Sequence, residues 1–373
     1  MELRSASLGG SASRSIGTRV VEESAGWNAL LDRLASGQVL QSYAWGEFAS
    51  RAGWLPVRVA HDRGGRPIAA TQLLLRQSSV GRVAYVPRGP SIAPGEDAAL
   101  PELIEQLHGV ARDHQAQALT IEPAWRDDRF LAARLRALGF LPTDALQPRT
   151  TLLLDLRADL GSLTAGLSPR TRYNVRAATS HGVTIEPSGE AELPTFYRLL
   201  LETSQRSHFS IQPYDYYAAL WHDLAGTGQA HLLMARHGGD TVGVAMLLTM
   251  GTAAYYMYGG SAATHRDVKP SDFLQWEAIR WARERGCLTY DLGGIPDEVG
   301  RETDGRRDDR ASSGDESADA SRELWGVYHF KRGFGGCPVR YVGAFTYVYE
   351  PRRHWLWQVL APRVRTLAGL FER

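Results

Sequence analysis

Residues 57–76 read VRVAHDRGGRPIAATQLLLR, in which two apolar runs flank a glycine pair at 64–65. Two strand-like runs joined by adjacent glycines are typical of a β-hairpin with a tight turn. Residues 231–250 read HLLMARHGGDTVGVAMLLTM and carry a glycine pair, 238–239, at the same point. The sequence therefore predicts the same hairpin twice, and such repetition sets the architecture before any single motif does.

Each predicted hairpin is followed by a short strand, a helix that opens near a proline, and a second strand, in the same order. The matching segments are 83–86 and 255–258 for the first strand, 101–114 and 270–286 for the helix, and 119–122 and 288–291 for the second strand. Proline suits the first turn of a helix, where its missing N–H is not needed. The alternative is that an ordinary α/β protein contains this order twice by chance.

Hairpin, strand, helix and strand form the central order of the GNAT acyltransferase fold, and the chain resembles two such units in tandem. We therefore expect an α/β protein with mixed sheets, built from two GNAT-like domains packed together. A chain of 373 residues also exceeds the usual size of a single core.

Composition sets the broad class. Hydrophobic residues make up 43% and charged residues 22%, as in ordinary globular proteins, and the net charge is +1. No overall field therefore marks a DNA-binding or membrane protein, and any such contact must rest on a local patch. Cys287 and Cys337 match no metal or redox spacing, so we expect inert thiols, no metal and a reducing compartment.

The predicted boundaries follow from these elements. Residues 1–17, rich in Ser, Gly and Ala, predict a disordered lead-in without the apolar core of a secretion signal. Residues 18–152 and 344–373 are assigned to the first domain, with a C-terminal helix. Residues 153–343 are assigned to the second domain, with a mobile charged insertion at 300–323. No run approaches the ~20 apolar residues of a membrane span, so we expect a cytoplasmic protein.

Residues 327–336, VYHFKRGFGG, are the stretch with the most unusual chemistry. A lysine held among aromatic side chains, here Lys331, can present its ammonium to the oxyanion that forms in acyl transfer. The alternative is a hairpin turn with one exposed lysine.

The phosphate-binding loop of single-copy GNAT enzymes, Gln/Arg-x-x-Gly-x-Gly/Ala, has no intact copy in this chain. The nearest segments, 283–288 and 332–337, both fail at the last position. Acyl-CoA is therefore a poor prediction for the donor.

A series of motifs in order makes the resemblance specific. The second half contains YMYGGS (256–261), LQWEAI (274–279), YDLGGI (290–295) and FKRGFGG (330–336). The first half adds QSYAWGEF (41–48) and PRGP (87–90), and RYNVRA (172–177) follows. From about residue 41 to 343 the chain resembles the compact members of the FemABX family, which lack a helical arm. These are aminoacyl-tRNA-dependent transferases that build peptidoglycan cross-bridges.

The resemblance implies a donor, an acceptor and a site. The donor is an amino acid esterified to tRNA, and the acceptor is a stem-peptide amino group on a lipid-linked or nucleotide-linked muropeptide; no cofactor is implied. Lys331 would stabilise the charge on the ester carbonyl, and Phe330 would set its position. The implied substrate-binding residues are Tyr256, Tyr258, Tyr217, Arg206, Trp45 and Gln41. For the tyrosines, the alternative is an ordinary place in the core.

Two departures from the family pattern bear on the acceptor. Ala49 stands where the family often has a phosphate-binding lysine, with Arg51 as the nearest cation, and Gln212-Pro213 replaces a second basic position. Both departures weaken the case for a free nucleotide-linked acceptor. Asp291 and Glu122 occupy equivalent repeat positions, which favours a structural role for both, so the sequence identifies no general base.

Two further contacts stay open. Arg170, Arg172 and Arg176 form a cluster that tRNA phosphates would attract. The alternative is that they are ordinary solvent-exposed side chains at the start of a helix. Residues 353–373 mix Trp, Leu and Arg and either pack on the first domain or lie on the inner membrane. The competing functions are an acyl-CoA-dependent transferase acting on an exopolysaccharide or another amine, and a non-catalytic binding module.

Overall fold

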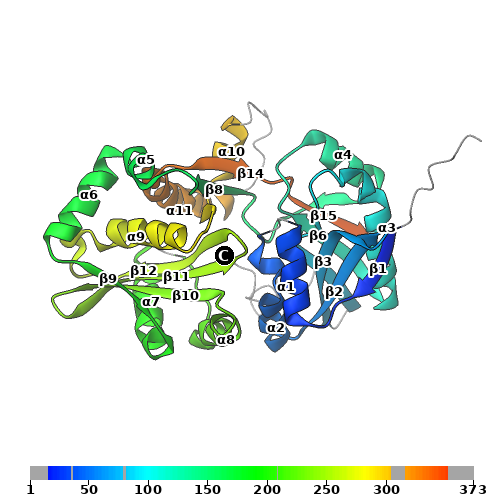
Figure 1. The fold of residues 1–373 in the computed structure, drawn as a ribbon, viewed down its shortest axis with the longest axis horizontal. Helices are drawn as coiled ribbons and strands as arrows, with labels where there is room; N and C mark the ends of the chain where they lie inside the picture. Colours follow the sequence, from blue (N-terminus) through cyan, green and yellow to red (C-terminus); the bar gives the residue numbers. More distant parts are fainter. Residues whose placement is uncertain (1–15, 35–36, 79–80, 208, 304–315, 352–373) are drawn as a thin grey trace, which may run out of the picture.

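The computed structural model describes residues 16–34, 37–78, 81–207, 209–303 and 316–351, which form two mixed sheets side by side, each covered by helices (Figure 1). The first sheet has the strand order β1-β2-β3-β4-β6-β15-β7, with β5 paired to β3. The second sheet, read in the same sense, has the order β9-β10-β11-β12-β13-β8-β14. The predicted class, α/β with two GNAT-like units, is confirmed.

The strands of the first sheet are β1 (Ile16–Val20), β2 (Trp54–Arg63), β3 (Arg66–Ser78), β4 (Gly81–Arg88), β5 (Ser91–Ile92), β6 (Ala116–Pro123), β7 (Leu141–Thr143) and β15 (Ala344–Val348). The strands of the second sheet are β8 (Thr150–Asp155), β9 (Thr184–Ser188), β10 (Ala230–His237), β11 (Asp240–Met250), β12 (Ala253–Ser261), β13 (Thr289–Gly294) and β14 (Cys337–Arg340). The predicted hairpins are β2–β3 and β10–β11.

One pair of strands in each sheet runs parallel, and the two pairs are equivalent. These pairs are β4 with β6 and β12 with β13, while the other paired strands run antiparallel. Parallel neighbours need a long crossover. The helices that open near a proline supply it: α3 (Leu100–Asp113) in the first half and α9 (Pro270–Glu284) in the second.

The sixth position of each sheet is filled by a strand from the far side of the repeat. β15, near the end of the chain, lies between β6 and β7, and β8, which precedes the second hairpin, lies between β13 and β14. The chain therefore crosses between the halves twice, at residues 143–150 and 340–344.

A hydrophobic cluster joins the two halves. Helices α1 (Ser24–Arg33) and α2 (Tyr43–Arg51) contribute Trp27 and Phe48, which are fully buried. They belong to the same cluster as Phe196 of α7 (Leu193–Ser207) and Leu220 of α8 (Tyr214–Ala225). This shared core fixes one half against the other.

The remaining helices are α4 (Arg129–Ala137), α5 (Leu160–Gly166), α6 (Pro169–Ser180), α10 (Asp297–Thr303) and α11 (Glu316–Lys331). Short 3-10 turns are η1 (Val39–Gln41), η2 (Asp97–Ala99), η3 (Glu190–Glu192), η4 (Arg266–Val268) and η5 (Arg332–Phe334).

Two predicted loops are partly regular structure. Residues 16–17 of the predicted lead-in open β1, because the edge of β2 offers backbone groups that an extended chain can pair with. In the predicted insertion, residues 300–303 end α10 and 316–323 begin α11. Alanine and glutamate give 316–323 good helix propensity, which an argument from burial alone overlooks. Residues 1–15, 304–315 and 352–373, including the predicted C-terminal helix, lie outside the described residues.

Candidate active site

A cavity of about 340 Å³ lies between the two halves. Its lining residues from the first half and the crossing segments are Gln38, Leu40, Trp45, Arg88, Leu146, Gln147, Pro148, Thr151 and Tyr341. Those from the second half are Ser207, Phe209, Tyr216, Tyr255, Tyr256, Met257, Tyr258, Gly259, Asp291, Gly293, Gly294, Leu324, Val327 and Lys331. A mostly apolar wall with a few polar groups is the usual character of a small-molecule site.

Lys331 brings the ammonium to this cavity. It is the last residue of α11, its side chain is buried, and Nζ donates a hydrogen bond to the Gly294 carbonyl oxygen at 2.8 Å. Burial lowers the pKa of Lys331 to about 8, although the carboxylate of Asp291 opposes the shift. The side chain is therefore mostly protonated at neutral pH. Gly293 has a φ of +84°, and a Cβ there would lie 3.3 Å from Nζ, so glycine suits this position.

Asp291, on β13, supplies a carboxylate to the same cavity. Its Oδ1 accepts hydrogen bonds from the Gly293 N–H, at 2.7 Å, and from the Thr151 hydroxyl. No hydrogen bond to Oδ2 is found within the described part of the chain. Burial raises the pKa of Asp291, while these hydrogen bonds and the charges of Arg88 and Lys331 act against the rise. Sequence reasoning missed this residue, because it treated Asp291 and its repeat equivalent Glu122 alike.

Phenols form one wall of the cavity. Tyr256 and Tyr258 of β12 both line it, together with Tyr255 and Met257 between and beside them. Strict alternation would send consecutive residues to opposite faces. A bulge at Met257 breaks the pairing of β12 with β11, which lets successive side chains reach the cavity. Burial raises the pKa of Tyr256 to about 12, so these phenols are neutral hydrogen-bonding groups at pH 7.

The neighbouring helix α8 contributes Tyr216. Its Oη lies 3.0 Å from the Oη of Tyr258. Tyr217, the predicted residue, is not among the lining side chains. It is 2% exposed, its ring packs 5.0 Å from that of Tyr258, and its hydroxyl accepts from the Gln212 N–H. Consecutive helical residues point about 100° apart, so Tyr216 reaches the cavity while Tyr217 packs behind it.

Two family models match the chain. A GNAT acetyltransferase domain model matches residues 169–303, and the FemAB family model matches residues 27–137. A Staphylococcus haemolyticus protein named lipid II:glycine glycyltransferase is 25% identical over 88% of this chain and 92% of its own length. A Staphylococcus aureus (strain USA300) protein of the same name is 24% identical with the same coverage.

The crystal structure of FemX superposes with a TM-score of 0.78, at 22% identity, over 92% of this chain and 99% of that one. These matches support membership of the FemABX family. The resemblance seen in the motifs is thereby confirmed, and the family and GNAT matches make the chain an acyltransferase.

Trp45 lines the cavity from α2. It is 3% exposed, and its indole Nε1–H has no hydrogen-bond partner within the described ranges. A buried donor without a partner costs free energy. Trp45 is therefore a group that a bound acceptor oxygen would satisfy.

Three predicted residues lie away from the cavity. Gln41 is fully buried, with Nε2 donating to the Pro87 carbonyl at 2.6 Å and Oε1 accepting from the Gln72 N–H. Arg206 donates to the carbonyl and hydroxyl of Ser261, at 3.3 and 3.1 Å. Both use their polar atoms to hold strands in place, and neither lines the cavity.

Phe330 is the third of these residues, although it precedes Lys331 directly. Its ring packs 5.2 Å from that of Phe334, against the core of the second half. It secures the end of α11 and does not line the cavity.

The predicted tRNA cluster is divided. Arg170 and Arg176 are exposed on α6, whereas Arg172 is half-buried and donates to the carbonyls of Ala165 and Leu167 at the end of α5. Arg172 therefore connects two helices.

Arg88 is a further residue of the cavity that sequence reasoning quoted only within a motif. Its guanidinium donates to the Pro148 carbonyl at 2.8 Å and stacks over the Tyr341 ring, 4.5 Å from its centroid. Together with Lys331 it makes one side of the cavity cationic.

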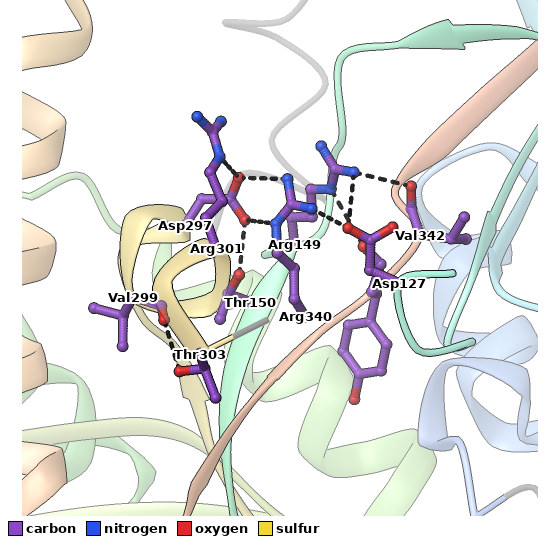
Figure 2. Close-up of polar contacts among 10 residues, drawn as sticks. Asp127, Arg149, Thr150, Asp297, Val299, Arg301, Thr303, Arg340 and Val342 are labelled. Atoms are coloured by element: carbon purple, nitrogen blue, oxygen red, sulfur yellow. Dashed lines mark hydrogen bonds and ion pairs between the residues drawn. The ribbon is translucent and has the colours of Figure 1, made fainter. Parts of the chain in front are cut away.

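A buried ion network holds the halves together beside the cavity (Figure 2). Arg340 of β14 donates to Asp297 at 2.9 and 3.0 Å and also binds Asp127 of the first half. Burial acts to raise the pKa of Asp297, but hydrogen bonds from Arg340 and Thr150 lower it to about 2. Arg149 adds hydrogen bonds to the carbonyls of Tyr341 and Val342. Charges paired in this way resist separation, because either partner alone would be buried unpaired.

Within the described residues no cluster of His, Cys, Asp and Glu is arranged to hold a metal ion. None of the helices in these ranges has the length and apolar character needed to cross a membrane.

Proposed function

We propose that the chain transfers an aminoacyl group from aminoacyl-tRNA to a stem-peptide amino group of a lipid-linked peptidoglycan precursor. The observation that carries the proposal is the buried Lys331 ammonium in a phenol-walled cavity between the halves. The relatives named lipid II:glycine glycyltransferase support a lipid-linked acceptor. The absence of a lysine at Ala49 points the same way.

In this reaction the acceptor amine attacks the carbonyl carbon of the ester that joins the amino acid to tRNA. A C–N bond forms, the ester C–O bond breaks, and the tRNA ribose oxygen leaves with a proton. Negative charge develops on the carbonyl oxygen, where the Nζ of Lys331 stabilises it. A preorganised donor in a site that excludes water is worth ~3–4 kcal/mol of barrier.

The amine must also lose a proton, and Asp291 is the carboxylate positioned to take it. Its Oδ1 is held by Thr151 and Gly293, which leaves Oδ2 for the acceptor. Burial raises its pKa, and a higher pKa makes a carboxylate a better base. The proton then passes to the leaving ribose oxygen, so the enzyme returns to its starting state.

For the donor, exposed Arg170 and Arg176 support a contact with tRNA phosphates. Replacing both with Gln should flatten the dependence of tRNA affinity on salt by about 0.7 per lost contact. An unchanged slope in filter-binding measurements at several salt concentrations would remove both arginines from the donor site.

The experiment that tests the function offers the purified protein a panel of charged tRNAs. Each is combined with a lipid-linked or a nucleotide-linked muropeptide, and the products are read by mass spectrometry. We expect one aminoacyl addition, preferentially on the lipid-linked acceptor. Transfer from acyl-CoA, with no product from any charged tRNA, would replace the proposal with the acyl-CoA alternative.

A further inference from the structure

Helix α4 lies at the outside of the first half (Figure 1). Its outer face combines apolar and cationic side chains. Arg129 and Arg136 are seven residues apart, and Phe130, Ala133 and Ala137 are spaced by three and four, so all five point the same way. All five are exposed. We call this set, with the exposed Leu141 that opens β7, the α4 face.

Exposure at the α4 face is high for large apolar side chains. Phe130 is 66% exposed and Leu141 is 62% exposed. The guanidinium of Arg129 lies over the Phe130 ring, 5.1 Å from its centroid. This helix exposes an aromatic ring and two arginines to solvent on one face. Helices that lie at bilayer surfaces have the same combination of side chains.

The charge of this face is not neutralised by the described residues. Arg129 and Arg136 have no ion pair among them, and the carboxylate of Asp128 caps the helix by accepting from the Phe130 N–H at 2.7 Å. Arg134 donates to the backbone carbonyl of Asp97. The surface therefore presents net positive charge.

We propose that the α4 face docks the protein on an anionic lipid bilayer. The inference rests on the proposed function only in that a lipid-linked acceptor lies in such a surface. Charge complementarity selects the occupant: residues 352–373 carry five arginines and one glutamate, so like charge disfavours that segment. RNA would match the arginines, but it offers nothing to Leu141 and the alanines.

Direct contacts also link the α4 face to the residues that line the cavity. Asp127, which precedes the cap of α4, binds Arg340 of the second half (Figure 2). The backbone of Arg126 pairs with that of Tyr341, which lines the cavity. Residues 146–148, which follow β7, line the cavity as well. Docking on the bilayer would therefore fix the orientation of the cavity relative to the lipid headgroups.

The test is co-sedimentation of the full chain with vesicles that contain no acceptor. One set is phosphatidylcholine alone, and the other contains phosphatidylglycerol in addition. We expect binding to the anionic set only. Arg129→Gln with Arg136→Gln should weaken it about 25-fold, since each arginine at such a surface contributes about fivefold. Phe130→Ser with Leu141→Ser should weaken it at least about fivefold through lost insertion of apolar surface.

Matched controls lie elsewhere on the surface. Arg266→Gln with Arg285→Gln removes two exposed arginines, one of them stacked on a ring as Arg129 is, and Val20→Ser removes a side chain that is 63% exposed. These should bind as the wild type does. Equal binding by the α4 variants, or no binding by the wild type, would overturn the proposal; loss of tRNA affinity instead would assign the face to RNA.

The docking and the transfer fail separately. Transfer to a water-soluble muropeptide should be unchanged in the α4 variants, while transfer to a vesicle-embedded acceptor falls with vesicle binding. If no acceptor is modified but vesicle binding still depends on the α4 face, the proposed function fails and the docking surface stands.

Discussion

Glu122 and Asp291 occupy equivalent strands of the two halves and are used differently. Glu122 is 2% exposed and accepts hydrogen bonds from the Tyr85 hydroxyl at 2.7 Å and from the N–H groups of Leu146 and Gln147. Both of its oxygens are occupied. Asp291 has one oxygen held and borders the cavity beside Lys331. One copy of the repeat thus keeps its carboxylate for structure, while the other copy has it free to meet a ligand.

The helices that follow these strands also differ in whether they contribute to the cavity. In the first half β6 is followed by α4 and the edge strand β7, and in the second half β13 is followed by α10, α11 and the edge strand β14. Helix α11 ends on Lys331 and points it into the cavity, whereas α4 exposes its outer face. A duplicated fold can therefore place reaction chemistry in one copy and leave the other for support.

The largest expected effect is on Lys331→Met, which removes the cation from the active half. Single-turnover transfer should fall about 10²–10³-fold, because the variant loses the ammonium that stabilises the developing oxyanion. The matched control is Lys269→Met, which removes the other lysine of the chain. Wild-type rates in Lys331→Met would end the assignment, and circular dichroism verifies that the variant is folded.

A second effect separates the two carboxylates directly. Asp291→Asn should lower the transfer rate about 10²-fold, since an amide cannot accept the proton. Glu122→Gln should leave the rate per folded molecule within about twofold. If both variants lost the same activity, the carboxylates would be equivalent and the distinction between the halves would be wrong.

The same two variants should rank in the opposite order when the free energy of unfolding is measured. Glu122→Gln places an NH₂ group among three donors, so the free energy of unfolding should fall by about 1–3 kcal/mol in urea denaturation. Asp291→Asn should cost less, because only one of its oxygens is held. A smaller loss for Glu122→Gln than for Asp291→Asn would contradict the structural role of Glu122.

A fourth effect concerns the pH dependence of stability. The pKa of Lys331 is about 8 in the folded chain against an ordinary 10.5, so the unfolded chain binds more protons between these values. Stability should therefore rise with pH from about 8 to 10.5, by up to ~3 kcal/mol at 1.36 kcal/mol per unit. The difference between wild type and Lys331→Met isolates this contribution. A constant difference would show that burial does not perturb the lysine.

The sequence predicts the architecture well because its signals are local. Glycine pairs between strand-like runs define the hairpins, and a proline at a helix start defines each crossover. Side-chain direction is not local in this sense. Tyr216 and Tyr217 differ only in helical phase, and the bulge at Met257 turns side chains that strict alternation would separate.

Asp291 was overlooked for another reason. Asp291 and Glu122 hold the same position in the repeated backbone. Their hydrogen-bond partners differ, and these partners decide whether each carboxylate can reach a ligand. Two of the three donors to Glu122 are backbone N–H groups of a crossing segment, 146–147, whereas Asp291 accepts from Thr151 and Gly293. Such long-range contacts do not appear in the pattern of a single chain.

The most direct test of the central claim is the pH–rate profile of single-turnover transfer, corrected for ester hydrolysis measured without enzyme. The account places a protonated lysine with a pKa of about 8 at the reacting carbonyl. The acceptor amine loses its own proton with rising pH in every variant, so the informative quantity is the ratio of the wild-type rate to the Lys331→Arg rate, because the arginine keeps its charge. This ratio should fall as pH rises through about 8, and a ratio that stays constant from pH 7 to about 9.5 would contradict the account.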